Sequence, residues 1–202
     1  MIKPVKIFSI LLFFSSCSAV SYSELGPLVK TAVLGSPDIE ISQDYVADKE
    51  YSFARMRLGR SATAILTLSR IENDIFIWVS GNNEKIYTYN GKVIKIDGLI
   101  HNFESYNYKL FDLQSLLNKE IHSYEMDIFF TNPDAFVSQA VSLEIQRPNN
   151  ETLHIIENIN TNGFRWKVTN EYWIDSNSRL PVKSHQHIHP HLPKIEIDYY
   201  FK

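Results

Sequence analysis

Cysteine is almost absent from this sequence, since Cys17 is the only one among 202 residues. A single thiol cannot form an intramolecular disulfide, even in an oxidising compartment. Positive charge is not abundant either: 20 Lys and Arg against 23 Asp and Glu give a formal net charge of −3. This balance argues against a nucleic-acid partner, because such proteins usually carry a basic surface.

Catalytic patterns are also missing. The sequence contains no Gly-x-Ser-x-Gly elbow, no His-Glu-x-x-His pair, and no glycine pattern that binds phosphates or dinucleotides. No internal repeat of solenoid length occurs. We therefore expect one domain that is not an enzyme and needs no cofactor. The apolar share of 44% is ample for its core.

The N-terminus has the pattern of a targeting segment. Lys3 and Lys6 precede an apolar run over 7–14, which is too short for a transmembrane helix of about 20 residues. The small residues Ser15 and Ser16 then lead to Cys17, as in a bacterial lipobox, with Phe14 where Leu is more usual. We predict a signal peptide over 1–16 and lipidation of Cys17; the alternative is a plain secretory peptide. Two or more acyl chains would anchor the protein stably.

The rest of the chain is expected to form a tether and one folded domain. A tether over 17–24 would lead into a single barrel-like domain over 25–202. Ser18, rather than Asp, follows the cysteine. This favours the outer membrane over retention at the inner membrane, and we expect the domain to face the periplasm.

Short helices are predicted near the start of the domain and in one loop. Ser23 could cap a first helix that ends near Gly35, and Ser42 a second over 43–48. Asp112 is expected to cap a helical turn. From Tyr51 onward the apolar pattern mostly alternates, which is typical of half-buried strands. Strands are predicted at 62–68, 75–79, 86–89, 92–96, 124–130, 136–146, 152–158, 164–173, 181–189 and 194–201.

Many short strands without long intervening helices predict a mainly β fold. We expect an antiparallel β-barrel or a strongly curled sheet. The sharpest local signal is Asn90-Gly91 between two strands, which predicts a hairpin with a type I′ turn. Pairing across that turn would place Tyr87 opposite Ile94, and Tyr89 opposite Lys92.

Four histidines alternate near the C-terminus, at positions 185, 187, 189 and 191. On one strand they would share a face, and alternate imidazoles can bind zinc or copper. Pro190 would end that strand, however, and no carboxylate or cysteine lies among them. We therefore predict a polar outer face and no metal site.

Aromatic residues are plentiful, with 11 Tyr, 12 Phe and 3 Trp. Their rings stack on sugars and serve interfaces, but strands and cores favour them as well. For any single ring a structural role in a strand or core is favoured over a binding role. The candidates are Trp78, Tyr87, Tyr89, Trp166, Tyr172 and Trp173.

Two stretches resemble a known family. The first runs from Tyr51-Ser52-Phe53-Ala54 through Trp78-Val79-Ser80 to the segment 89–95 and Gly98-Leu99. The second runs from Asn170-Glu171-Tyr172-Trp173-Ile174-Asp175 to the segment 182–187 and Pro190. Together they resemble the YjbF/GfcB family of lipoproteins, over roughly residues 45 to 202. Lys92 stands where Arg is common, and Arg179-Leu180-Pro181 replaces a turn that contains Gly.

The resemblance implies a barrel-like fold, outer-membrane attachment and a part in making, exporting or retaining surface polysaccharide. It implies no enzymatic activity and supplies no agreed functional residues, so Gly91 and Gly98 are interpreted as backbone positions. Gln186 and His187 lie in its most family-like segment and join Trp78, Tyr87 and Trp173 as candidate binding residues.

A weaker likeness points to a second hypothesis. The segment 172–175 followed by Leu180-Pro181 looks like the strand-turn-strand of periplasmic lipid-carrier half-barrels. The first hypothesis is therefore a non-catalytic factor that binds glycan or an export partner, and the second is a carrier of a lipid or other amphiphile. A metal-binding periplasmic protein is third. A long apolar cavity would favour the carrier, and a filled interior with exposed aromatics would favour the binder.

Overall fold

The computed structural model describes residues 39–202 except 119–121, 150 and 164. These residues form twelve strands and three short helical segments. In chain order they are α2 (Gln43–Asp48), β1 (Phe53–Leu58), β2 (Ala64–Glu72), β3 (Ile75–Val79), β4 (Lys85–Tyr89), β5 (Lys92–Asp97), β6 (Phe103–Ser105), η1 (Tyr108–Leu110), α3 (Leu113–Leu117), β7 (Ser123–Phe130), β8 (Ala135–Gln146), β9 (Thr152–Thr161), β10 (Lys167–Asp175), β11 (Pro181–Gln186) and β12 (Ile195–Tyr200).

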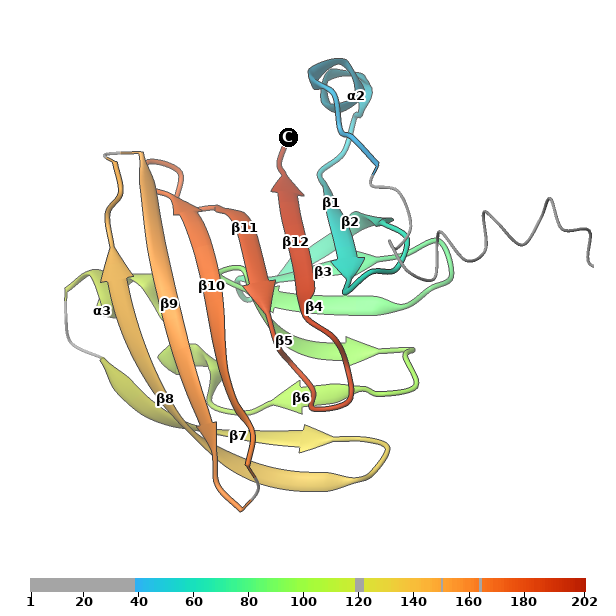
Figure 1. The fold of residues 1–202 in the computed structure, drawn as a ribbon. Helices are drawn as coiled ribbons and strands as arrows, with labels where there is room; N and C mark the ends of the chain where they lie inside the picture. The colour runs from blue at the N-terminus through green and yellow to red at the C-terminus, as the bar shows by residue number, and fades with distance from the viewer. Residues whose placement is uncertain (1–38, 119–121, 150, 164) are drawn as a thin grey trace, which may run out of the picture. The chain divides into compact units, whose positions relative to one another are not determined.

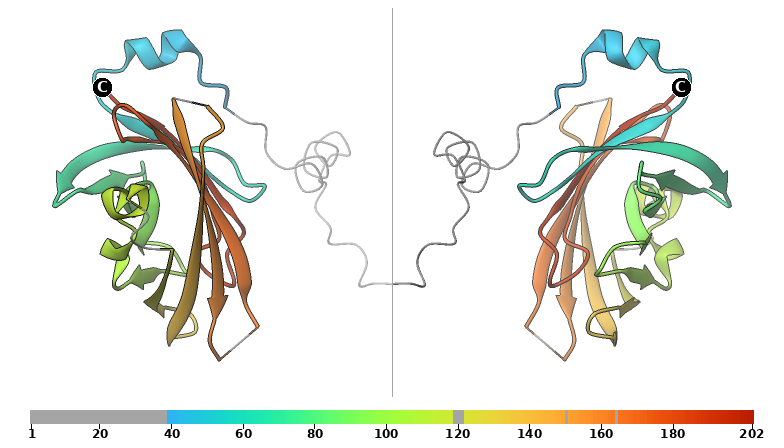
Figure 2. Two further views of the ribbon diagram at one scale, coloured as in Figure 1. Left: turned by 90° about the vertical axis from the view of Figure 1, so that its left-hand side faces the viewer. Right: turned by 90° about the vertical axis from the view of Figure 1, so that its right-hand side faces the viewer.

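The strands close into an antiparallel barrel, which confirms the predicted fold class. Each strand pairs with its neighbours along the chain, and β1 closes the ring by pairing with both β2 and β12. Figure 1 shows the cyan β1 beside the red β12. The long strands β8–β10 twist strongly, as the views turned by 90° show (Figure 2). Closure leaves no free sheet edge within the barrel.

Side chains point alternately to the two faces of the sheet along each strand, and this alternation decides which residues fill the barrel. On β9, Leu153, Ile155, Glu157 and Ile159 are buried, whereas the residues between them are more exposed. Successive side chains of a strand point to opposite faces of the sheet, so one set lines the interior. The apolar inward residues join one hydrophobic core, and Glu157 is a buried charge among them.

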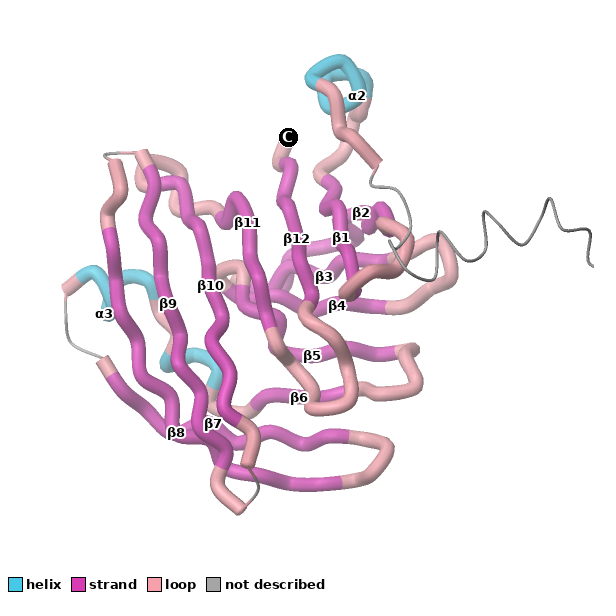
Figure 3. Tube along the Cα trace, in the orientation of Figure 1, coloured by secondary structure: helices cyan, strands magenta, loops and turns pink. Residues whose placement is uncertain are grey.

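Both helices predicted in the described region are present (Figure 3), and each has its predicted cap. Ser42 accepts from the Tyr45 amide at the start of α2. Asp112 accepts from the Ser115 amide at the start of α3, which buries Leu116. Within the described ranges, no helix is long and apolar enough to cross a membrane. The helix expected between Ser23 and Gly35 lies outside the described residues, as does Cys17.

The Asn90-Gly91 hairpin has the predicted backbone, with φ of 50° and 81° at the two turn residues. Tyr89 pairs with Lys92, as expected. The pairing of Tyr87 with Ile94 is wrong, because an irregularity between Tyr87 and Thr88 shifts the register and places Tyr87 opposite Lys95.

One predicted strand extends too far at its C-terminal end. The strand expected over 181–189 stops at Gln186, because its partner β12 begins only at Ile195 and the connection between them carries Pro190 and Pro193. The predicted strands do not include β1 or β6, and β6, with three residues, is too short to show alternation.

Candidate functional site

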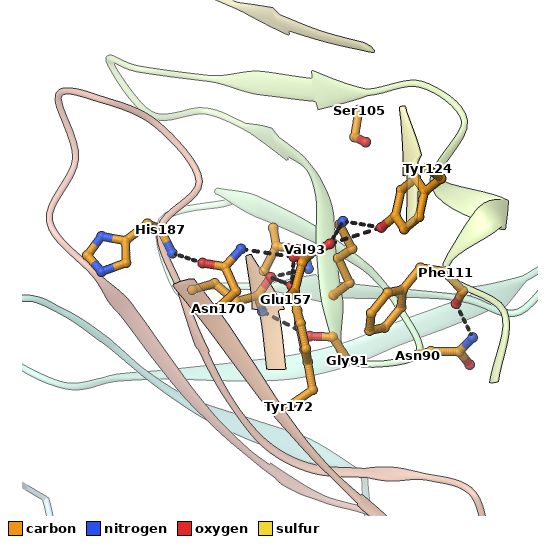
Figure 4. Close-up of polar contacts among 12 residues, drawn as sticks. Asn90, Gly91, Val93, Ser105, Phe111, Tyr124, Glu157, Asn170, Tyr172 and His187 are labelled. Atoms are coloured by element: carbon orange, nitrogen blue, oxygen red, sulfur yellow. Dashed lines mark hydrogen bonds and ion pairs between the residues drawn. The ribbon is translucent and has the colours of Figure 1, made fainter. Parts of the chain in front are cut away.

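A network of buried polar side chains crosses the barrel interior (Figure 4). Its centre is the ion pair between Lys92 at the start of β5 and Glu157 in the middle of β9. The exposed fractions of the two side chains are 4% and 0%. A pair so deeply shielded needs further hydrogen bonds to offset the loss of solvation.

Three neutral donors supply those hydrogen bonds. The Tyr124 hydroxyl donates to Glu157 Oε1 over 2.9 Å. The Tyr172 hydroxyl and Asn170 Nδ2 donate to Oε2 over 2.6 Å and 3.0 Å. Lys92 Nζ also donates to the Tyr124 hydroxyl over 3.0 Å. Each carboxylate oxygen therefore has two donors, drawn from β5, β7 and β10.

The protonation states follow from these contacts. Burial raises the pKa of Glu157, but the charge of Lys92 and the hydrogen bonds outweigh it, so the pKa lies below its usual value. Burial, with the nearby Glu157 charge, raises the pKa of Tyr124 and Tyr172 well above the usual range. At neutral pH the carboxylate is thus ionised and both tyrosines are donors. The network holds four strands together and offers no free nucleophile or base.

Gln186 extends the hydrogen bonding to β11. Its Oε1 accepts from the Val93 amide over 2.8 Å, and its Nε2 donates to the Gly91 carbonyl over 2.9 Å. The Tyr199 hydroxyl donates to the same carbonyl over 3.0 Å. Gln186 is 1% exposed. Its role is therefore to tie the Asn90-Gly91 hairpin to the opposite wall of the barrel.

The interior beside this network is nearly full. A cavity bordered by Lys92, Gln139, Asn170 and Gln186 offers about 10 Å³ to the centre of a water molecule. That is close to the smallest space that can hold one water. An acyl chain does not fit in this part of the interior.

The aromatic candidates divide between the interior and the outer face. Trp78 is 1% exposed, and its Nε1 donates to Thr88 Oγ1 over 2.9 Å, so it belongs to the core. Tyr87 is half-buried on the outer face, where Lys95 Nζ lies 5.8 Å from its ring centroid. A surface ligand can reach Tyr87 and the half-buried His187, but not Trp78 or Gln186, because those two are enclosed by the barrel.

Trp173 lies at the centre of a cluster on the outer face of β9, β10 and β11. The His154 ring stacks on its indole with centroids 4.7 Å apart, and the His185 ring meets it edge-on at 5.0 Å. Lys183 Nζ lies 5.8 Å from the indole centroid. The Glu171 carboxylate is 3.3 Å from His154 Nε2 and 3.8 Å from His185 Nδ1. We refer to these five residues as the Trp173 cluster.

The alternating histidines do not share one face. His185 is on the outer face, as predicted, but His189 is buried at 2% exposure and packs against Phe130 and His101. The prediction is wrong for His189 because the strand, and with it the alternation, stops at Gln186. Burial and then His101 lower the pKa of His189 to about 4. Within the described ranges, His, Cys, Asp and Glu form no group of three that could hold a metal ion.

Comparison with known proteins places this barrel among its relatives. A family described as group 4 capsule polysaccharide lipoprotein GfcB, YjbF, matches residues 27–199. The chain belongs to this family. The uncharacterized lipoprotein GfcB of Escherichia coli K12 is 24% identical over 186 residues, and the match covers 86% of each chain.

A crystal structure of a relative shares the fold. It is the hypothetical lipoprotein YmcC from Escherichia coli K12, which matches with a TM-score of 0.68 and 19% identity. The match covers 92% of this chain and 98% of that chain. The family description names a lipoprotein and capsule polysaccharide, and it names no catalytic activity.

Sequence reasoning missed the buried ion pair, although a signal for it was present. Glu157 occupies the apolar register of β9, between Ile155 and Ile159. A carboxylate on the apolar face of a strand predicts a buried charge, which requires a buried partner. The partner itself, Lys92, lies 65 positions away and could not be chosen from the pattern.

Proposed function

We propose that this chain is a lipid-anchored accessory factor in capsule or exopolysaccharide export or assembly. It binds glycan or an export protein with its outer surface and catalyses no reaction. The family description supports the link to capsule polysaccharide and to lipoproteins. The predicted signal peptide over 1–16 and the lipidation of Cys17 complete the proposal, with the domain at the outer membrane and facing the periplasm.

The observation that carries this proposal is the lack of space in the barrel interior beside the buried Lys92–Glu157 network. The small cavity beside Lys92 admits about one water, whereas pockets for small molecules usually measure roughly 300–1,000 Å³. A carrier would need such a space for its cargo. The lack of space beside the network weighs against a carrier that holds its cargo there, and it leaves the outer face and the ends of the barrel for a binding function.

The Trp173 cluster is the part of the outer face that best suits a polar ligand. It combines a half-buried indole with two imidazoles, one carboxylate and one ammonium group on three adjacent strands. Amphipathic aromatic groups with polar neighbours are frequent in interfaces and in contacts with sugars. Neighbouring strands fix these side chains, so the surface is formed before a ligand arrives.

Crosslinking in intact cell envelopes, followed by purification of the full-length protein, tests the proposal. We expect polysaccharide or an envelope export protein to be recovered with it, above an unrelated lipoprotein. Trp173→Ala should lower the recovery at an equal protein level, and Tyr51→Ala, which changes an exposed aromatic outside the cluster, should not. Recovery of neither polymer nor export protein would contradict the proposal. One equivalent of extractable free lipid would favour the carrier instead.

A further inference from the structure

A groove of about 210 Å³ opens at the end of the barrel beside α3. Its apolar lining comes from Leu113 and Leu117 of α3 together with Leu153 and Ile174 of the barrel wall. Its polar lining comes from the connections that follow β8 and β10, and it includes two arginines, Arg147 and Arg179. We call this the Arg groove.

Arg179 has an unusual backbone for its residue type. Its φ is 60°, in the left-handed region that disfavours residues with a Cβ. Each of the other described residues with positive φ is Gly, Asn or Asp, and these types tolerate that region. Arg179 Nη1 donates to Gln114 Oε1 on α3 over 2.9 Å, which holds the guanidinium beside the groove. Backbone strain of this kind clusters at functional sites, and here it occurs at a residue that lines the groove.

In two other polar residues of the groove, Asn149 and Asp175, an acceptor oxygen is already hydrogen-bonded, so mainly donor groups remain for a ligand. Asn149 Oδ1 already accepts from the amides of Glu151 and Thr152, over 3.0 Å and 2.7 Å. Asp175 Oδ1 accepts from the Ser178 amide and hydroxyl over 2.7 Å and 2.8 Å. These hydrogen bonds lower the pKa of Asp175, so it is ionised. The lining therefore contains two arginines and one aspartate, whose Oδ1 is already engaged, so it has an excess of positive charge.

We propose that the Arg groove binds the carboxylate of an acidic sugar unit. The planar guanidinium group of arginine matches a carboxylate in a bidentate geometry, and the apolar lining suits the C–H face of a sugar ring. At about 210 Å³ the groove suits one unit of a chain rather than a large ligand.

The position of the groove agrees with a glycan that continues along the barrel wall. Asp175 lies two residues beyond Trp173 on β10, so the two share the outer face at about 7 Å separation along the strand. Thr152 pairs with Asp175, and His154 with Trp173, in the same register. The inference deepens the glycan-binding form of the proposed function and rests on it.

Binding of a defined oligosaccharide to the full-length protein in detergent tests the Arg groove. The probe is a hexasaccharide that alternates glucuronate with N-acetylglucosamine. Its matched control is the same hexasaccharide with the carboxylates reduced to alcohols, and inorganic phosphate is a third arm. We expect saturable, salt-sensitive binding of the acidic form, at least about 10-fold weaker binding of the reduced form, and little competition by phosphate.

Variants distinguish a loss of binding in the Arg groove from a loss of the fold. Arg147→Gln and Arg179→Gly should each weaken binding about 10-fold. Arg179→Gly relieves the strained backbone, so its melting temperature should not fall. Arg70→Gln is the control, because Arg70 is exposed on β2 and pairs with Glu72.

Three results would overturn the inference: no binding of the acidic form, equal binding of the reduced form, or full competition by phosphate. Binding that both groove variants leave unchanged would overturn it as well. Continued recovery of polymer in the crosslinking experiment would then leave the proposed function standing.

Discussion

Replacing Glu157 by Gln should be among the most destabilising isosteric changes in this protein. Gln removes the charge that balances Lys92, whose side chain is 4% exposed. The NH₂ group of Gln must also replace one of the two carboxylate oxygens, and it is itself a donor. In one orientation it meets the donors Tyr172 and Asn170, and in the other it meets Lys92 and Tyr124. Breaking a buried pair in this way costs about 3–5 kcal/mol. For a chain of this size, that lowers the melting temperature by roughly 6–20 °C.

Removing the other partner of the ion pair, Lys92, should destabilise the protein less. In Lys92→Met the Glu157 carboxylate keeps the hydrogen bonds from Tyr124, Tyr172 and Asn170. Lys92→Met should therefore be about 1–2 kcal/mol less destabilising than Glu157→Gln. The double variant should be less destabilised than the sum of the two, because it leaves no unpaired charge.

Urea unfolding followed by tryptophan fluorescence measures these differences, with an unchanged m-value as the check for two-state behaviour. The exposed pair Lys95–Glu104, at 3.3 Å, is the control. Lys95→Met and Glu104→Gln should each change stability by less than about 1 kcal/mol. The reasoning would be refuted if Glu157→Gln cost less than about 1 kcal/mol, or if Lys92→Met cost more than Glu157→Gln.

Three further predictions concern the anchor, a buried histidine and the hairpin. Cys17→Ala should abolish incorporation of radioactive fatty acid and leave an uncut precursor; label retained by the variant would exclude the lipidation site. His189 has a pKa of about 4 in the folded protein and about 6.5 when unfolded, so the unfolded state binds the extra proton between these values. Stability should therefore fall by about 2–3 kcal/mol as the pH drops from 7 to 4.5, and His189→Leu should remove that part of the dependence in urea titrations. Gly91→Ala should cost about 2–4 kcal/mol, because a Cβ at φ +81° would lie 2.8 Å from Pro181 Cβ. The control Gly163→Ala, with φ +91° and no atom within 4 Å, should lose only about 1–2 kcal/mol for backbone strain, and equal losses in melting experiments would show that the contact with Pro181 is unimportant.

Local signals predicted most of this fold. Ser42 and Asp112 marked two helix starts, and Asn90-Gly91 marked the hairpin, because caps and tight turns depend on residues close in sequence. The pairing of β1 with β12, which closes the barrel, joins residues 137 to 147 positions apart, from Leu58–Ile195 to Phe53–Tyr200. The alternation of each strand does not choose its partner, so closure could be expected only as a class of fold.

The candidate surface was less predictable for the same reason. Trp173 and His185 stood out in the sequence, but His154 and Glu171 did not. The cluster exists because the registers of β9, β10 and β11 place these four side chains together. The register shift beside Tyr87 shows how an irregularity, which leaves no clear mark in the sequence, changes the neighbours of a candidate residue.

Deleting the gene and measuring polysaccharide tests the proposed role in the cell most directly. Surface or secreted polymer should decrease, while growth and cytoplasmic sugar-nucleotide pools stay normal, because the proposed factor is anchored outside the cytoplasm and assists the polymer after its precursors are made. The wild-type gene should restore the polymer, and the Trp173→Ala variant should restore less of it at an equal protein level. A deletion strain with normal amounts of surface and secreted polysaccharide would contradict the account.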